Sequence, residues 1–227
     1  MRDYYTNYPR SILWLIQGGS ILIGGAESNA TPTFEAEVES FYLGKFPVTN
    51  KQFEAFDPAF RRSPLSPAER DPAAGVSFEE ASAYCRWYAG VSRKKIRLPS
   101  EVEWEYACRA GSNSRYFFED PEEADRYIWD RRNSQHKVQS LEAKQPNSFG
   151  LYGMLGSVWE WTASCFRPYP LPSRDAEAPA GPALRVLRGG SWQMGREEIS
   201  CSLRRAEPPD IRIEEAGFRI ARSFRSG

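Results

Sequence analysis

The stretch RLPSEVEWEYACR, residues 97–109, gives the clearest local prediction of structure in this sequence. Ser100 is followed three residues later by Glu103. In such a capping box the serine hydroxyl accepts from the amide of the third residue, whose side chain reaches back to the serine amide. A helix is therefore expected to begin at Ser100. Its apolar residues follow at helical spacing: Trp104, Ala107 and Cys108.

Two further capping boxes stand upstream of this one. Thr49 precedes Gln52 by three residues, and Ser77 precedes Glu80 in the same way. Each predicts the start of another helix. The second of these helices carries a stripe of side chains at helical spacing that we expect to be buried: Ala81, Tyr84, Cys85 and Tyr88.

The rest of the chain favours short strands and irregular segments. Residues 12–16 and 18–25 indicate two short strands around a glycine turn, and 39–46 a third strand. Residues 26–38 and 57–75 are expected to be loops. From residue 111 onward, turn signals replace helical patterning. We therefore expect an α+β fold with its helices in the first half.

Length and composition narrow the domain count and the class of partner. At about 100–200 residues per domain, 227 residues predict a single domain over residues 1–227. With 30 Lys+Arg against 30 Asp+Glu, the chain lacks the basic excess of a nucleic-acid binder, so no nucleic-acid partner is expected. The only histidine, His136, excludes sites with several imidazole ligands, and its polar surroundings predict a solvated side chain.

No stretch approaches 18 uninterrupted apolar residues, so no membrane insertion is expected. The apolar stretch from Ser11 to Gly25 is a poor match to a signal peptide. Four cysteines are too few for a disulfide scaffold. These observations favour a cytoplasmic protein, with secretion as the alternative.

Seven motifs in order resemble the formylglycine-generating-enzyme, or sulfatase-modifying-factor, family. The resemblance covers about residues 12–222, and the motifs read YLGKFPVTNKQF (42–53), VSFEEASAYC (76–85), RLPSEVEWEYACR (97–109), PNSFGLY (146–152), VWEWT (158–162), RVLRGGSW (185–192) and GFR (217–219). The resemblance implies a single loop-rich domain related to the C-type lectin fold.

The chemistry that the resemblance implies is the oxidation of a substrate cysteine by two copper-binding thiols. Two soft thiolates close together hold Cu(I). Family members carry this pair shortly after the Gly-Gly-Ser-aromatic motif, whereas residues 193–201, QMGREEISC, hold one cysteine. Counted back from the motif at 217–219, Cys201 falls on a structural position of the family. Copper and the standard oxidase activity are therefore not expected, and no catalytic residue is assigned.

The same resemblance gives two readings for the pair Cys108 and Cys201. Their counterparts form a disulfide in secreted relatives, so the two could be bridged. Alternatively they are buried thiols, which suits a cytosolic protein. Both readings make Cys108 and Cys201 structural.

A calcium site is the next implication of the resemblance. Some relatives bind calcium in the loop before Trp159, through an Asn or Asp side chain, two backbone carbonyls and a glutamate carboxylate, which suit a hard cation. Here Glu160 would supply the carboxylate, with carbonyls from Gly156 and Val158. The side-chain ligand position is Gly153, which offers only its backbone. The alternative is that Glu160 accepts backbone hydrogen bonds between two buried tryptophans. No other cofactor is expected.

The C-terminal part of the chain is the candidate binding surface. Residues 185–227 hold nine arginines and no lysine. Arginine suits bidentate contacts and stacking, which favours recognition of a protein or small ligand through a face at 192–213. The alternative is that Arg188, Arg205 and Arg219 pair internally with glutamates. The candidate ligand-binding residues are Trp192, Gln193, Met194, Arg196, Glu197, Arg204, Asp210 and Arg212.

The preferred function is therefore a non-catalytic binding or accessory module. One alternative is an enzyme that uses the same groove for other oxidative or cofactor-free chemistry. The other is a variable ligand-binding protein of a diversity-generating retroelement. The C-terminal segment of such proteins resembles the stretch from RVLRGGSW (185–192) to GFR (217–219). Gln193, Met194 and Glu197 weaken this version, because adenine-directed variation of asparagine codons cannot produce these residue types.

Overall fold

A computed structural model describes residues 10–171 and 183–224 of the chain. Its α-helices have these bounds: α1 Asn50–Phe56, α2 Phe78–Ser92 and α3 Glu101–Arg109. The hydroxyls of Thr49, Ser77 and Ser100 each accept from the third helical amide, and the reciprocal side-chain bond is present at all three. The three predicted helix starts are therefore confirmed. The predicted stripe of α2 is buried as well.

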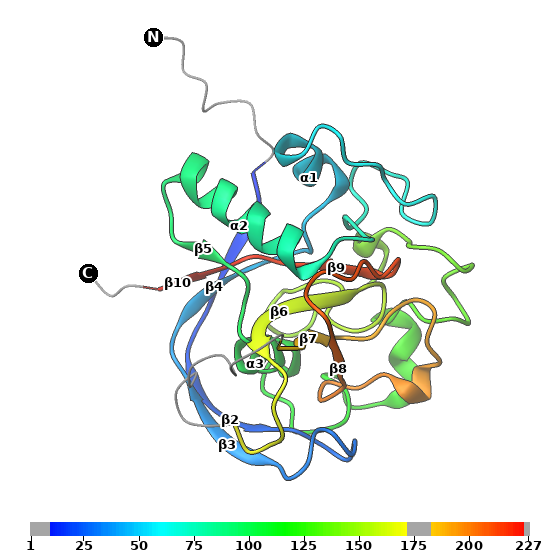
Figure 1. The fold of residues 1–227 in the computed structure, drawn as a ribbon. Helices are drawn as coiled ribbons and strands as arrows, with labels where there is room; N and C mark the ends of the chain where they lie inside the picture. Colours follow the sequence, from blue (N-terminus) through cyan, green and yellow to red (C-terminus); the bar gives the residue numbers. More distant parts are fainter. Residues whose placement is uncertain (1–9, 172–182, 225–227) are drawn as a thin grey trace.

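The strands form three antiparallel or mixed sheets (Figure 1). The first sheet has the order β1 Leu13–Ile16, β4 Phe41–Gly44, β10 Ala221–Ser223 and β5 Ile96–Arg97. The second is the hairpin of β2 Gly19–Ile23 and β3 Phe34–Val38. The third has the order β8 Arg204–Glu207, β7 Arg185–Arg188, β6 Trp159–Cys165 and β9 Ala216–Phe218. Short 3-10 helices are η1 Pro121–Arg126, η2 Leu141–Ala143 and η3 Arg196–Glu198.

The two N-terminal strands are present, but one expectation about this region is wrong. β1 pairs with β4, and β2 pairs with β3. Residues 26–38 are not all loop, since β3 occupies Phe34–Val38. The apolar residues of β3 alternate with glutamates, and Phe34 and Ala36 pack against the cluster around the buried Ile23.

Helix α3 contributes to the core with two faces of different chemistry. Trp104, Ala107 and Cys108 are fully buried, as the sequence predicts. Glu101 and Glu105, four residues apart and so on one side of the helix, are buried as well. Burying a carboxylate is costly unless it is paired. Each of these glutamates is accordingly matched by arginine from the third sheet.

Buried ion pairs between α3 and the third sheet connect the two halves of the chain. Arg204 contacts Glu101 with an Nε–Oε2 distance of 2.9 Å, and Arg188 pairs with Glu105. Arg205 pairs with Glu207 and Glu215, and Arg219 with Glu160. The alternative that Arg188, Arg205 and Arg219 pair internally is confirmed.

In the part of the chain described, no helix is both long and apolar enough to span a bilayer.

Candidate binding face

A glycine turn after β7 leads into the candidate binding segment that starts at residue 192. Gly189 and Gly190 have φ values of 96° and 76°, a region that favours glycine. A Cβ on Gly189 would also lie 3.0 Å from the carbonyl oxygen of Met154. Directly after this turn Trp192 is 4% exposed and packs with Ala74, Val138 and Val158. Trp192 therefore anchors the segment, and the expectation that it contacts a ligand at the surface is wrong.

Residues 193–198 present polar side chains to solvent. Gln193, Glu197 and Glu198 are exposed, whereas Met194 is half-buried against the core. The side chain of Arg196 is 14% exposed and turns inward. Its Nε donates to Asp130 Oδ2 over 2.7 Å, and its Nη2 donates to Asp125. Arg196 thus fixes the segment rather than offering a free cation.

The loop at residues 125–137 contacts this segment. The amide of Arg131 donates to the carbonyl of Met194 over 3.0 Å, and Arg132 contacts Glu197 at 3.1 Å. Ser134 donates to the carbonyl of Trp192. We define the binding face as the exposed residues of segments 131–137 and 193–198: Arg131, Arg132, Gln135, His136, Lys137, Gln193, Glu197 and Glu198.

The loop at 125–137 is held in shape by its own acidic residue. Asp130 is fully buried, and its Oδ1 accepts from the amide of Arg132. The side-chain oxygen of Asn133 accepts from the amide of Asp130, and its side-chain nitrogen donates to the carbonyl of Ile128. His136 is exposed with φ 56°, so the prediction of a solvated imidazole is confirmed.

Charge pairing across the face changes the acidity of its carboxyl groups. Hydrogen bonds from Arg196 and Asn133 lower the pKa of Asp125. The pKa of Glu197 is also lowered, by a hydrogen bond from its own backbone and then by Arg132. Burial lowers the pKa of Arg196, but its bonds to Asp130 and Asp125 outweigh this and raise it. The pairing therefore favours the ionised form of each of these groups.

Two polar groups beneath the face have no hydrogen-bond partner among the described residues. They are the Oγ of Ser157 and the Nε1 of Trp192. The amide of Trp192 donates to the carbonyl of Ser157 over 2.9 Å, so the two residues are adjacent. Ser157 also has φ 61°, which is uncommon for a residue other than glycine. Unsatisfied and strained groups of this kind cluster at functional sites.

The remaining candidate residues do not lie on this face. Arg204 is buried in its pair with Glu101, so its assignment to a ligand-binding surface is wrong. Arg212 is exposed but contacts Glu80 at the N-terminal end of α2, with 3.0 Å between Nε and Oε2. Asp210 is exposed in the same stretch, where the carbonyl of Pro209 accepts from the amide of Glu79. The expected single face at 192–213 is therefore divided between two places.

All four cysteines of the chain lie in the described residues, and they are free thiols. The Sγ atoms of Cys108 and Cys201 are 3.6 Å apart and both residues are fully buried. Burial raises the pKa of Cys108 well above the ordinary thiol value, and that of Cys85 to about 12. Cys165 lies at the end of β6, paired in register with Arg185. Cys108 and Cys201 are therefore buried thiols here, as the second of the two interpretations expects.

The residues proposed for calcium do not fit a hard cation. Glu160 Oε2 accepts from Trp104 Nε1 over 2.8 Å and from Arg219 Nε over 2.6 Å, and Oε1 accepts from Arg219 Nη2. The guanidinium of Arg219 neutralises this carboxylate in the core, where Coulomb interactions are strong. Among the residues described, no three His, Cys, Asp or Glu side chains gather as a metal site. The structure favours the alternative that Glu160 accepts hydrogen bonds in the core, but its donors are the side chains of Trp104 and Arg219 rather than backbone amides.

Sequence reasoning missed the acidic anchors of the face, Asp125 and Asp130. Their partner Arg196 lies some 66 to 71 residues along the chain, so no local pattern links them. A usable local signal was the spacing of Asp130 and Asn133, because such residues hydrogen-bond nearby amides in turns.

The chain matches the family described as "Sulfatase-modifying factor enzyme 1-like domain" over residues 6–224. It is 27% identical to "Inactive C-alpha-formylglycine-generating enzyme 2" of Mus musculus, over 92% of the chain and 84% of that protein. It is 30% identical to "Serine/threonine-protein kinase pkn1" of Chlamydia pneumoniae over 92% of the chain, which spans only 38% of that protein. The solved structure titled "Treponema denticola variable protein 1" superposes with a TM-score of 0.83 at 21% identity, covering 93% of this chain and 95% of that one. The expected α+β, formylglycine-generating-enzyme-like fold is confirmed.

Proposed function

The chain belongs to the sulfatase-modifying factor enzyme 1-like domain family, and we propose that it is a non-catalytic binding module of that family. Its binding face, formed by residues 131–137 and 193–198, recognises a polar protein surface. The mixed charges of the face, with Arg131 and Arg132 beside Glu197 and Glu198, suit a partner of mixed charge.

The observation that carries the proposal is the distribution of the thiols. Copper-dependent oxidation of a cysteine needs two accessible thiolates close together. The face presents none, because residues 192–198 contain no cysteine. Cys108 and Cys201 are adjacent but fully buried, and burial keeps Cys108 protonated. The oxidase chemistry of the family therefore has no thiol pair at this surface.

The anchoring of the face supports a role in recognition. Arg196 is held by two aspartates, and the backbone of Met194 accepts from Arg131. Fixing both loops before binding reduces the entropy lost when a partner docks. Exposed Gln193 and Glu197 then project from a support that does not need to reorganise.

Site-specific crosslinking tests this proposal. A photoreactive residue is introduced at Gln193 and, as a matched control, at exposed Lys51 in α1. The position-193 variant should crosslink one partner that the position-51 variant does not. The purified partner is then titrated with the wild type and with Gln193→Ala and Arg132→Glu. We expect each substitution to weaken binding about tenfold, equal to about 1.4 kcal/mol.

Equal affinity of the purified partner for the wild type and for both variants would overturn the proposal. So would copper-dependent oxidation of a peptide cysteine by the protein, because it would make the chain an enzyme of the same family. Other oxidative or cofactor-free chemistry at this face would appear instead as turnover abolished by Ser157→Ala with partner binding unchanged.

The likeness to the variable protein of Treponema denticola supports a second candidate, a variable binder. In that case closely related copies of this chain would differ at exposed positions whose residue types such variation can produce, Asp210 and Arg212. They would keep the buried Trp192 and Arg204. Sequencing the copies in one strain separates the two candidates, since identical residues at the exposed positions contradict the variable version.

A further inference from the structure

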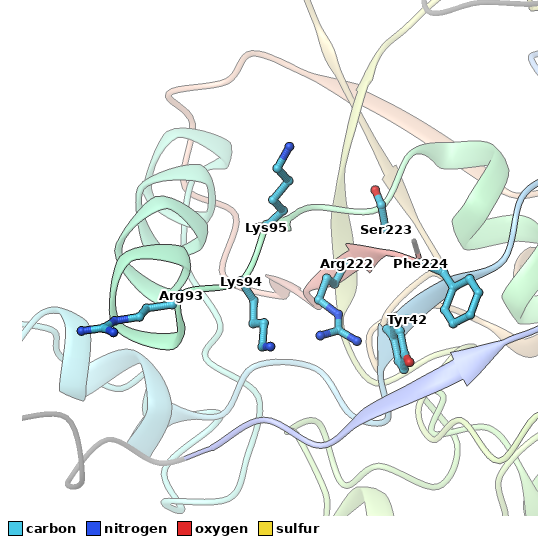
Figure 2. A pocket seen from close by; sticks show the side chains of 7 residues that line it. All are labelled: Tyr42, Arg93, Lys94, Lys95, Arg222, Ser223 and Phe224. Atoms are coloured by element: carbon cyan, nitrogen blue, oxygen red, sulfur yellow. The ribbon is translucent and has the colours of Figure 1, made fainter. Parts of the chain in front are cut away.

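A second surface, away from the binding face, is lined by several basic residues and by no acidic one. It is an open hollow of about 280 Å³ between the α2–β5 connection and the strands β4 and β10 (Figure 2). Its lining residues are Tyr42, Arg93, Lys94, Lys95, Arg222, Ser223 and Phe224. Four of them are basic and none is acidic, so the hollow favours an anionic ligand.

Arg222 lies at the centre of this arrangement. Its position is set by register, since it pairs with Tyr42 on one side and with Ile96 on the other. Its guanidinium carbon lies 3.9 Å from the centroid of the Tyr42 ring. In the described structure no carboxylate or carbonyl accepts from Arg222, and its Nε is buried without a partner. The fork of this arginine is therefore oriented by stacking, while its hydrogen-bonding capacity is unused.

Lys94 supplies a second cation on the same side. Figure 2 shows its side chain extending in the same direction as that of Arg222, toward the space beside Tyr42. No described carboxylate pairs with Lys94 or Lys95. Cations that no described carboxylate neutralises attract an anion.

The shape of the hollow indicates more than a bare ion. The rings of Tyr42 and Phe224 have centroids 5.9 Å apart and form an apolar wall, with Phe224 40% exposed. A volume of this size approaches that of small-molecule sites and exceeds the space of one phosphoryl group. We propose that the hollow binds a small phosphate monoester, with its phosphoryl group on Arg222 and Lys94 and its organic part against Phe224.

This assignment follows from the chemistry of the two cations. An arginine fork matches two phosphate oxygens at once, and a lysine adds a point charge. A dianionic phosphomonoester satisfies both, whereas a carboxylate carries a single charge. The aromatic wall gives an organic substituent the contact that inorganic phosphate lacks.

The test is a titration of the full chain with phenyl phosphate at low ionic strength, followed through backbone amide shifts in NMR spectra. We expect saturable shifts at residues 93–95 and 222–224, and weaker binding of inorganic phosphate. Lys94→Glu and Arg222→Gln should each reduce the affinity for phenyl phosphate at least tenfold. Lys51→Glu, the same charge reversal at an exposed lysine of α1, is the matched control and should leave it unchanged.

Lys94→Glu changes an exposed side chain, so this variant remains informative even where Arg222→Gln disturbs the sheet. Shifts that do not saturate, or an affinity unaffected by Lys94→Glu, would overturn the proposal. Tighter binding of a polyglutamate peptide than of phenyl phosphate would replace the site by a docking surface for an acidic polypeptide. Binding to phosphatidic acid vesicles without shifts by phenyl phosphate would replace it by a lipid surface.

Discussion

Glu160 illustrates how one buried carboxylate suggests two different roles. Its motif resembles a calcium-binding sequence, yet its carboxylate accepts from Trp104 and from Arg219, which is fully buried. A cation added here would compete with a guanidinium that already neutralises the charge. The role of Glu160 is decided by its partner Arg219, which is 59 residues away in the chain.

Glu160→Gln should lower the free energy of unfolding by about 3–5 kcal/mol, because it leaves the guanidinium of Arg219 buried and unpaired. Urea denaturation of the wild type and variant measures this loss. Calcium should leave the melting temperature of the wild type unchanged. A rise in melting temperature with calcium that disappears in Glu160→Gln would restore the calcium site.

A second prediction at this scale concerns Asp125 and its contact with Arg196. Because the pKa of Asp125 is lowered in the folded chain, the contact stabilises the fold at pH values above the ordinary carboxyl pKa of 3.8. That contribution is lost as the pH falls through the lowered value. Arg196→Gln should raise the pKa of Asp125 toward 3.8, as NMR titration of its carboxyl group measures. An unchanged pKa would mean that Arg196 does not hold the aspartate.

The helices and the strands differ in how far the sequence predicts them. A capping box lies within four residues, so Thr49, Ser77 and Ser100 could be identified without knowing the fold. A strand depends on its neighbour: β1 is followed directly by β2 but pairs with β4. The alternation in β3 was present in the sequence, but without its partner β2 the segment resembles a polar loop.

Ser77→Ala should destabilise the chain by about 1 kcal/mol, because the first turn of α2 loses its capping hydrogen bond. Chemical denaturation gives this value. Ser28→Ala serves as the control, since Ser28 is exposed and its hydroxyl makes no hydrogen bond among the described residues. Equal stabilities of the two variants would show that the cap contributes nothing.

At the scale of the whole molecule, the family and fold follow from motifs, whereas the face does not. The motifs extend from residue 42 to residue 219, and the family match over 6–224 confirms them. The binding face joins residues 131–137 to 193–198 through pairs such as Arg132 with Glu197, separated by 65 positions. Such pairs depend on the completed fold. Sequence could therefore propose Gln193 and Glu197 but could not place Arg204 in the core.

The thiols provide the most direct test of the central claim, that this chain keeps the family fold without its oxidase chemistry. The protein is incubated with copper, oxygen and a peptide that carries a sulfatase-type cysteine, and the peptide is analysed by mass spectrometry. We predict that the cysteine remains unchanged, because Cys108 and Cys201 are buried and no thiol lies on the binding face. Conversion of the peptide thiol to an aldehyde, abolished by Cys201→Ser, would contradict the account.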